Sequence, residues 1–111
     1  MNQWITWVDR SFWQRQAAAR LAAILDAHPD LPAIAWTLAP AGSVLTGQVS
    51  GLAPAAQVRG VFAAWRLALE LEDYRELPMS GETTRLHAAA RRGEVTVQLT
   101  ATIFDEIEAS R

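Results

Sequence analysis

The stretch ETTRLHAAARRGEVTVQLTATI, residues 82–103, decides the fold. Apolar and polar residues alternate on both sides of its centre, which is the pattern of two strands with one face in water. Arg92-Gly93 is a two-residue loop between residues 82–91 and residues 94–103, because glycine readily takes the positive φ that such a loop needs. The stretch is therefore predicted to be a β-hairpin.

This hairpin register separates the side chains into two faces. On the apolar face the predicted pairs are Ala90 with Val95, Ala88 with Val97, and Leu86 with Leu99. On the polar face they are Arg91 with Glu94, His87 with Gln98, and Arg85 with Thr100. Antiparallel sheets that are wetted on one side show this division. The apolar face therefore requires a covering layer.

A second hairpin is predicted nearer the N-terminus. Residues 33–39 and 43–50 alternate in the same way, and a four-residue loop at residues 40–43 joins them. The apolar pairs in this register are Leu38 with Leu45, Trp36 with Gly47, and Ile34 with Val49. Because Gly47 has no side chain, the indole of Trp36 has room to lie across the neighbouring strand.

Residues 11–28 are predicted to form a helix that covers this sheet. Its apolar side recurs at helical spacing, at Trp13, Ala17, Leu21, Ile24, Leu25 and His28. Ser11 begins a capping box, with Asp9 as a competing start, and Pro29 ends the helix. Residues 1–8 are either an extra helical turn or an extended arm.

A second helix is predicted from Pro54 to about Glu70. Proline suits the first turn of a helix, and the buried stripe comprises Val58, Val61, Phe62, Trp65 and Leu69. Residues 74–80 are then either irregular or one short edge strand, because Pro78 limits backbone pairing there.

Together these elements predict an α+β fold built as a two-layer sandwich. The order is α-β-β-α-(β)-β-β, with an antiparallel sheet of four to five strands and two helices on one face. We expect a single domain over residues 1–111. Within it, residues 1–10 are an arm or a helix extension, and residues 104–111 are a tail or a short last turn.

The composition excludes several classes of function. The 111 residues carry a net charge of −2 and no cysteine, so neither a disulfide framework nor a thiolate zinc site is possible. There is no basic stripe for nucleic acid, and no apolar run near the roughly 18 residues that a membrane span needs. No basic n-region indicates a signal peptide. We expect a cytoplasmic protein without metal or cofactor.

His87 is the most plausible catalytic base in the sequence. A general base needs an orienting carboxylate and a substrate or nucleophile nearby. The predicted register offers Gln98 and Thr100 instead, which favours a solvated strand histidine.

The five tryptophans are a stronger signal. Trp13, Trp36 and Trp65 fall on predicted inward stripes, which core packing explains. Trp4 and Trp7 have no such place. They either cover one end of the core or form an exposed anchor, since tryptophan is enriched in interface hot spots.

The residues left over from the core favour a non-catalytic interaction or scaffold domain that binds a second copy of itself or another protein. The possible interaction surface comprises Trp4, Trp7, Arg85, His87, Arg91, Gln98 and Thr100. An alternative is a small-molecule-binding domain whose apolar pocket, between helices and sheet, is lined by indoles and closed by residues 73–81. The third hypothesis is an enzyme with His87 as base.

Three stretches resemble small proteins of high-GC actinobacteria. They are SFWQRQAAAR at residues 11–20, HPDLP at residues 28–32 and EVTVQLT at residues 94–100. The resemblance extends over most of the chain, and it implies a bacterial source and an intracellular compartment only.

Overall fold

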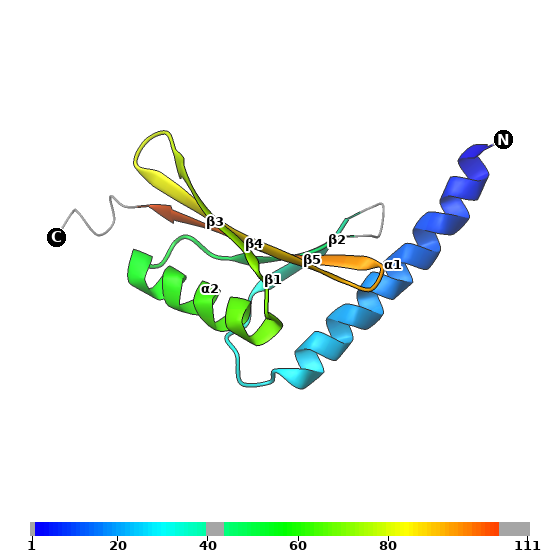
Figure 1. Ribbon diagram of the computed structural model, residues 1–111, viewed down its shortest axis with the longest axis horizontal. Coiled ribbons are helices and arrows are strands. Elements are labelled where there is room, and N and C mark those ends of the chain that lie inside the picture. Colours follow the sequence, from blue (N-terminus) through cyan, green and yellow to red (C-terminus); the bar gives the residue numbers. More distant parts are fainter. Residues whose placement is uncertain (1, 40–43, 105–111) are drawn as a thin grey trace.

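The structure is a computed structural model that describes the backbone of residues 2–39 and 44–104, with side chains from residue 11 onward in those ranges. Along the chain it forms α1 (Asn2–Ala27), β1 (Ala35–Leu38), β2 (Val44–Val49), α2 (Ala55–Leu69), β3 (Asp73–Met79), β4 (Thr83–Arg92) and β5 (Val95–Phe104). Helix α2 and the C-terminal half of α1 lie on one side of a five-stranded sheet, which confirms the predicted α+β class and its two layers (Figure 1). The predicted loop at residues 40–43 and the tail after Phe104 lie outside the described residues.

The first helix is longer than predicted and begins at Asn2. Ser11 and Asp9, the two predicted starting points, both lie inside it, so that prediction is wrong. Residues 2–27 contain neither glycine nor proline, and therefore nothing in the backbone interrupts the helix before Pro29. Of the two alternatives for the N-terminal segment, the helical one is confirmed.

The second helix, α2, spans almost the predicted residues. Its N-cap is Pro54, and its C-cap Glu70 has the left-handed φ of 56° that often ends a helix. Arg92 closes this end, because its Nη2 donates to the carbonyl oxygens of Leu69 at 3.1 Å and Glu70 at 2.8 Å. A cation at a helix C-terminus also favours the macrodipole. The last hairpin is thereby fastened to α2.

The strand order is β1-β2-β5-β4-β3, and the sheet is mixed. The prediction of a wholly antiparallel sheet is wrong at one ladder, because β2 and β5 run parallel. β5 has the most regular alternation in the chain, and it lies between β2 and β4 with every second side chain buried from Val95 to Ile103. Alternation specifies the face of each side chain but says nothing about the direction of the neighbouring strand.

The last hairpin forms with its pairing displaced by two residues from the prediction. Ala90 pairs with Val97 instead of Val95, and the loop is Gly93-Glu94. Gly93 has a φ of 65° while no positive φ occurs at Glu94, so the glycine takes the first loop position, as in a type II′ turn. Because the displacement is even, every side chain keeps the predicted face.

The first hairpin has the predicted register. Leu38 pairs with Leu45 and Trp36 pairs with Gly47, whereas Ile34 lies before the ladder begins. A Cβ built at Gly47 would come within 2.9 Å of Trp36, Ile34 and Leu99 side-chain atoms. The space above this glycine is therefore filled by the indole and its neighbours, as predicted.

The segment that sequence left open, residues 74–80, forms an edge strand. β3 pairs with β4 from Asp73 to Met79 despite Pro78. Its Tyr74 packs on α2, with its ring 5.9 Å from that of Phe62 and beneath the Arg66 guanidinium at 4.5 Å.

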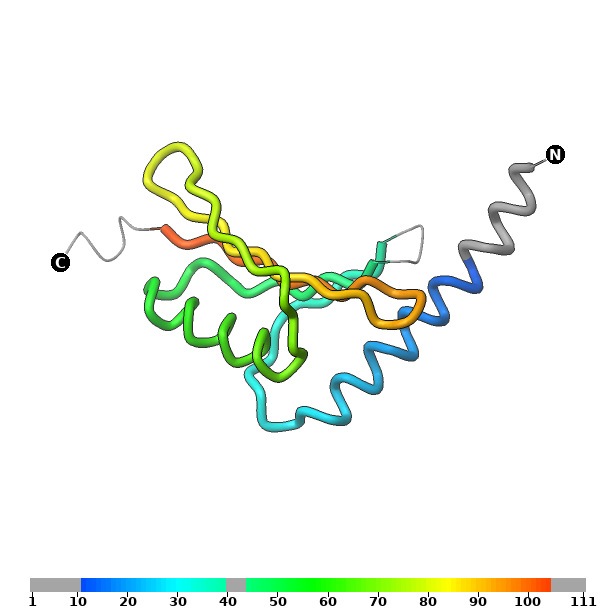
Figure 2. The backbone as a smooth tube through the Cα atoms, in the orientation of Figure 1, coloured from blue at the N-terminus to red at the C-terminus, as the bar shows by residue number. Residues whose placement is uncertain are grey.

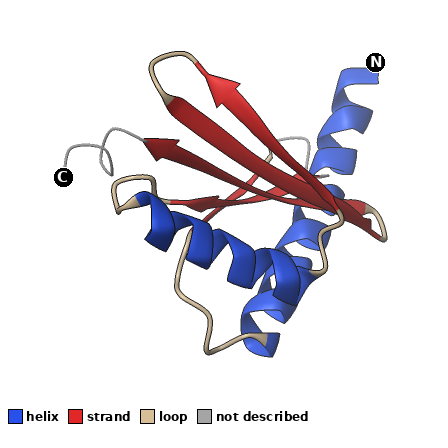
Figure 3. Ribbon diagram, turned by 60° about the vertical axis from the view of Figure 1, so that its left-hand side comes forward, coloured by secondary structure: helices blue, strands red, loops and turns tan. Residues whose placement is uncertain are grey.

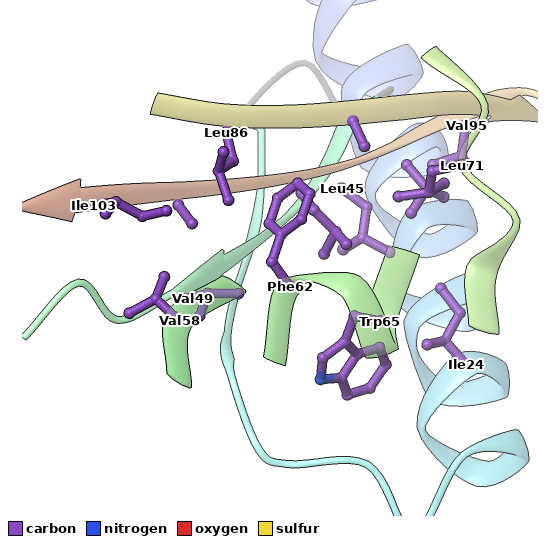
Figure 4. Close-up of a cluster of buried hydrophobic side chains, with 14 of the residues drawn as sticks. Ile24, Leu45, Val49, Val58, Phe62, Trp65, Leu71, Leu86, Val95 and Ile103 are labelled. Carbon is purple, nitrogen blue, oxygen red and sulfur yellow. The ribbon is translucent and has the colours of Figure 1, made fainter. Parts of the chain in front are cut away.

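The core lies between the sheet and both helices (Figure 4). Trp65 of α2 is at its centre with 1% exposure. Its Nε1 donates to the carbonyl oxygen of Pro32 at 2.8 Å, and its ring meets that of Trp36 edge-on at 5.6 Å. Trp36 and Trp13 are half-buried. Helix α1 adds Ala17 and Ile24 to the core.

A polar cluster fastens the edge strand to α2. Glu76 accepts hydrogen bonds from the Tyr74 hydroxyl at 2.6 Å and from Arg59 Nη1 at 3.0 Å. The hydrogen bond from Tyr74 and then the one from Arg59 hold the pKa of the Glu76 carboxyl below its usual value. Burial, followed by the bond to Glu76, raises the pKa of the Tyr74 phenol.

The lowered pKa of Glu76 predicts an acid-sensitive contribution to stability. The folded state favours the charged carboxylate, so the contribution is present above the ordinary glutamate pKa of 4.5 and is lost as pH falls through the lower folded pKa. In chemical denaturation between pH 6 and pH 3, we expect the natural chain to lose stability faster than Glu76→Gln below about pH 4.5. If the free energy of unfolding fell equally with pH in the two chains, the proposed contribution of the Glu76 carboxylate would be contradicted.

Candidate functional site

One face of the sheet is covered by neither helix (Figure 3). We call it the outer face, and it carries the polar side chains that the sequence placed opposite the core. On β4 and β5 they are Thr83, Arg85, His87, Arg91, Thr96, Gln98, Thr100 and Thr102. Thr37, Thr46 and Gln48 of β1 and β2 continue the same face. Five of the predicted site residues therefore share one surface: Arg85, His87, Arg91, Gln98 and Thr100.

A hydrogen-bonded chain crosses the middle of the outer face. Gln98 Nε2 donates to Thr46 Oγ1 at 2.9 Å, and Gln98 Oε1 lies 3.1 Å from His87 Nε2. All three side chains are half-buried. An amide oxygen next to Nε2 favours a proton on that nitrogen, so Gln98 orients the imidazole. Within the described residues this orienting partner is an amide, and no carboxylate hydrogen-bonds to His87.

The outer face carries more positive than negative charge. Its cations are Arg75, Arg85 and Arg91, whereas Asp73 is its only acidic strand residue in the described ranges. Arg75 Nε lies 3.5 Å from Asp73 Oδ1 at an exposed position. Among the described residues no carboxylate lies within 4.0 Å of the Arg85 guanidinium. A chain with net charge −2 thus presents a locally basic surface.

One corner of the outer face is apolar. Leu77 and Met79 of β3 are 45% and 47% exposed, and Phe104 at the end of β5 is 36% exposed. The registers bring them to the same end of the sheet, because Met79 pairs with Thr83 and Thr83 pairs with Phe104. Arg85 lies beside this corner, paired with Leu77. The corner therefore offers apolar contacts next to an unpaired cation.

Helix α1 extends beyond the sheet at its N-terminal end (Figure 1), and Figure 2 traces the same helix in colour from residue 11 onward. Its fully buried positions are Ala17 and Ile24, while Phe12 is 54% exposed. The ten residues from Asn2 to Ser11 span about 15 Å at 1.5 Å per residue. Trp4 and Trp7 belong to this part of the helix, and their side chains lie outside the described residues. The predicted tryptophan arm is thus a helix.

The outward side of α1 is poor in charge. Opposite the buried positions the helix carries small apolar residues, and these are exposed: Ala18, Ala19, Ala22 and Ala23. Phe12 and Arg15 precede them on that side. Small side chains let a second helix approach to the short end of the usual 8–10 Å spacing.

Two cavities are relevant to ligand binding. The first, of about 570 Å³, is open and lies where β1 begins, beside Gly51 and Phe104. The second, of about 220 Å³, lies between α1, α2 and β5 and is lined by Ile24, Leu69 and Val97 among others. Neither is lined by a tryptophan, and residues 73–79 form a strand. The indole-lined pocket expected from sequence has no counterpart in these two cavities.

The described residues contain no group of three or more histidine and acidic side chains placed to hold a metal ion. Within the same ranges, neither helix has the length and apolar character required to cross a bilayer. The chain matches no protein-family model, no curated protein and no solved structure.

Sequence reasoning missed the contribution of β3 to the outer face. Arg75, Leu77 and Met79 alternate with inward Tyr74, which is a strand signal. Pro78 and the charged residues around it obscured that signal, because both are typical of loops as well as of protected edge strands.

Proposed function

We propose that this chain is a non-catalytic protein-interaction domain that associates with a second copy of itself through helix α1. The observation that carries the proposal is the extension of α1 past the sheet, by about three turns, with Phe12 exposed near its root. A helix that projects in this way has little to pack against within its own chain. Contiguous exposed apolar surface marks interaction sites, and the exposed residues Ala19 and Ala22 continue the apolar side of the helix from Phe12.

The sequence of α1 supports helix pairing. Positions 5, 8, 12, 15, 19 and 22 are spaced alternately by three and four residues, which is the spacing of a coiled-coil seam. They hold Ile5, Val8, Phe12, Arg15, Ala19 and Ala22. At 100° per residue these positions lie roughly opposite Ala17 and Ile24, which face the core. The seam and the core-facing side therefore do not compete.

A second copy is favoured over another occupant because the seam is self-complementary in character. Apolar residues dominate its N-terminal half, and small residues dominate its C-terminal half. Twofold dimers are the commonest oligomers, and their interfaces use one patch twice. The outer face is a poorer self-interface, because stacking two copies would bring like charges of Arg75, Arg85 and Arg91 together.

Phe12→Glu is expected to raise the dimer dissociation constant by about tenfold or more, because it places a charge in an apolar seam. Leu67→Glu is the matched control, since Leu67 is 80% exposed on α2 and belongs to no proposed interface. Sedimentation velocity over micromolar concentrations measures both, with circular dichroism to verify helix content. Trp4→Ala and Trp7→Ala should weaken association in the same direction. A natural chain that is monomeric throughout this range, or equal behaviour of Phe12→Glu and Leu67→Glu, would contradict the proposal.

Small-molecule binding is a second candidate, and the cavity of about 220 Å³ between the helices and β5 favours it. Its floor is apolar and its rim carries Arg20 and Arg92, which is the combination typical of ligand sites. A thermal-shift screen against a broad metabolite set tests it, because a ligand that binds only the folded chain raises its melting temperature. The absence of any stabilising compound would count against this function.

A further inference from the structure

The basic charge of the outer face is matched by an acidic segment of the same chain. Residues 105–108, which directly follow β5, read Asp-Glu-Ile-Glu. We propose that this segment binds the outer face of its own chain at Arg85 and Arg75, with Ile107 against the apolar corner formed by Leu77, Met79 and Phe104. The proposal does not depend on self-association through α1.

Unpaired charge on the surface is the first support. No described carboxylate lies within 4.0 Å of Arg85, and Arg75 has only an exposed contact of 3.5 Å with Asp73. Guanidinium groups form bidentate hydrogen bonds with carboxylates. Asp105, Glu106 and Glu108 follow one another closely enough to reach both arginines.

The registers put both arginines within reach of the segment. Arg85 pairs with Thr102, two residues before Phe104 on β5, so it lies about 8 Å from Phe104 at standard sheet spacings. Arg75 pairs with His87 on the next strand and lies about 17 Å away by the same reckoning. Four extended residues span about 13–14 Å before their side chains are counted. A single reversal of the chain after Phe104 therefore suffices.

The apolar corner is the second support. Leu77 and Met79 are nearly half exposed beside Arg85, and Ile107 is the only strongly apolar residue among its acidic neighbours. A pattern of acid, acid, apolar, acid fits a surface in which apolar side chains adjoin two cations. Contact at the corner would also cover the end of edge strand β3. Covered edges are favoured because an exposed edge strand can pair with another chain.

The chain has no cysteine, so Ala109→Cys provides a single site for a nitroxide spin label. The experiment uses the full chain carrying Phe12→Glu, so that dimers formed through α1 contribute little to the loss of signal. In the NMR spectrum of the ¹⁵N-labelled protein, we expect the Arg85 and Leu77 amide signals to lose most of their intensity relative to the reduced label. The Ala22 and Ala23 amides of α1 should keep theirs.

Arg85→Glu should restore the lost intensity, whereas Leu67→Glu, at a position of α2 that is 80% exposed and belongs to no proposed interface, should leave the loss unchanged. High salt should also restore it, because the Debye length falls from about 10 Å at 0.1 M to about 3 Å at 1 M. Undiminished Arg85 and Leu77 signals would overturn the proposal, as would a loss that persists in Arg85→Glu. A mixture of spin-labelled chains without ¹⁵N and ¹⁵N chains without the spin label reports contacts between molecules. An equal signal loss in this mixture would overturn contact within one chain. If the NMR experiment contradicts binding of residues 105–108, the proposal of α1 pairing still stands, because sedimentation measures that pairing separately.

Discussion

Trp65→Ala is expected to lower the free energy of unfolding by about 3–5 kcal/mol, as truncation of a buried aromatic side chain does. The side chain is 1% exposed and contacts both the first hairpin, through Trp36, and the loop before it, through Pro32. Truncation leaves a cavity bounded by α2, β1 and that loop, and it leaves the Pro32 carbonyl without its donor. Small domains are stable by only about 5–15 kcal/mol, so the variant should be close to unfolded.

Trp65→Phe separates the two contributions. Phenylalanine keeps most of the buried volume but cannot donate to Pro32, so its cost should be clearly smaller than that of alanine. Urea denaturation followed by circular dichroism measures both variants. A loss below about 1 kcal/mol for Trp65→Ala would mean that the indole is not at the centre of the core.

Gly51→Ala is expected to cost about 3 kcal/mol, although it adds only one methyl group. A Cβ at position 51 would lie closer than 3.0 Å to the Thr102 carbonyl oxygen and 3.1 Å from Phe104 Cε2. The Thr102 oxygen belongs to the backbone of β5, so no side-chain rotation can relieve the overlap. The chain leaving β2 would have to move away from β5.

Gly60→Ala is the matched control for this substitution. Gly60 lies within α2, and nothing occurs within 4 Å of a Cβ built there. Alanine should therefore raise the free energy of unfolding by about 0.5–1 kcal/mol, through helix propensity and a less flexible unfolded chain. Denaturation midpoints that shift in opposite directions would confirm this account, and equal shifts would contradict it.

The local pattern predicted the faces of the sheet better than its pairings. Ala88 and Leu99 were assigned to the apolar face and lie there, although the hairpin pairs each with a different partner from the one predicted. Periodicity of two fixes the face, whereas the exact pairing depends on which loop position Gly93 occupies. The contact of Trp36 over Gly47 was predictable. A short loop allows few registers, and only one of them puts the apolar residues of both strands on the same face.

Other features depend on contacts between distant segments. The parallel pairing of β2 with β5 and the capping of α2 by Arg92 join residues far apart in sequence, and no local pattern encodes them. The outer face was recognised in outline through Arg85, His87 and Gln98. Its apolar corner was not, because Leu77 and Met79 belong to a strand that Pro78 disguised.

The central claim is that α1 pairs with α1 of a second copy, and the distance between two copies tests it most directly. A nitroxide on Gln16→Cys, an exposed position flanking the seam, allows pulsed dipolar spectroscopy on the full chain. The account predicts an intermolecular distance below about 35 Å, because packed helices lie about 8–10 Å apart and each residue adds only 1.5 Å along the axis. It also predicts that Phe12→Glu lowers the fraction of spins that show this coupling, in line with its raised dissociation constant. A chain that shows no intermolecular coupling at micromolar concentration, or the same coupling in Phe12→Glu, would contradict the claim.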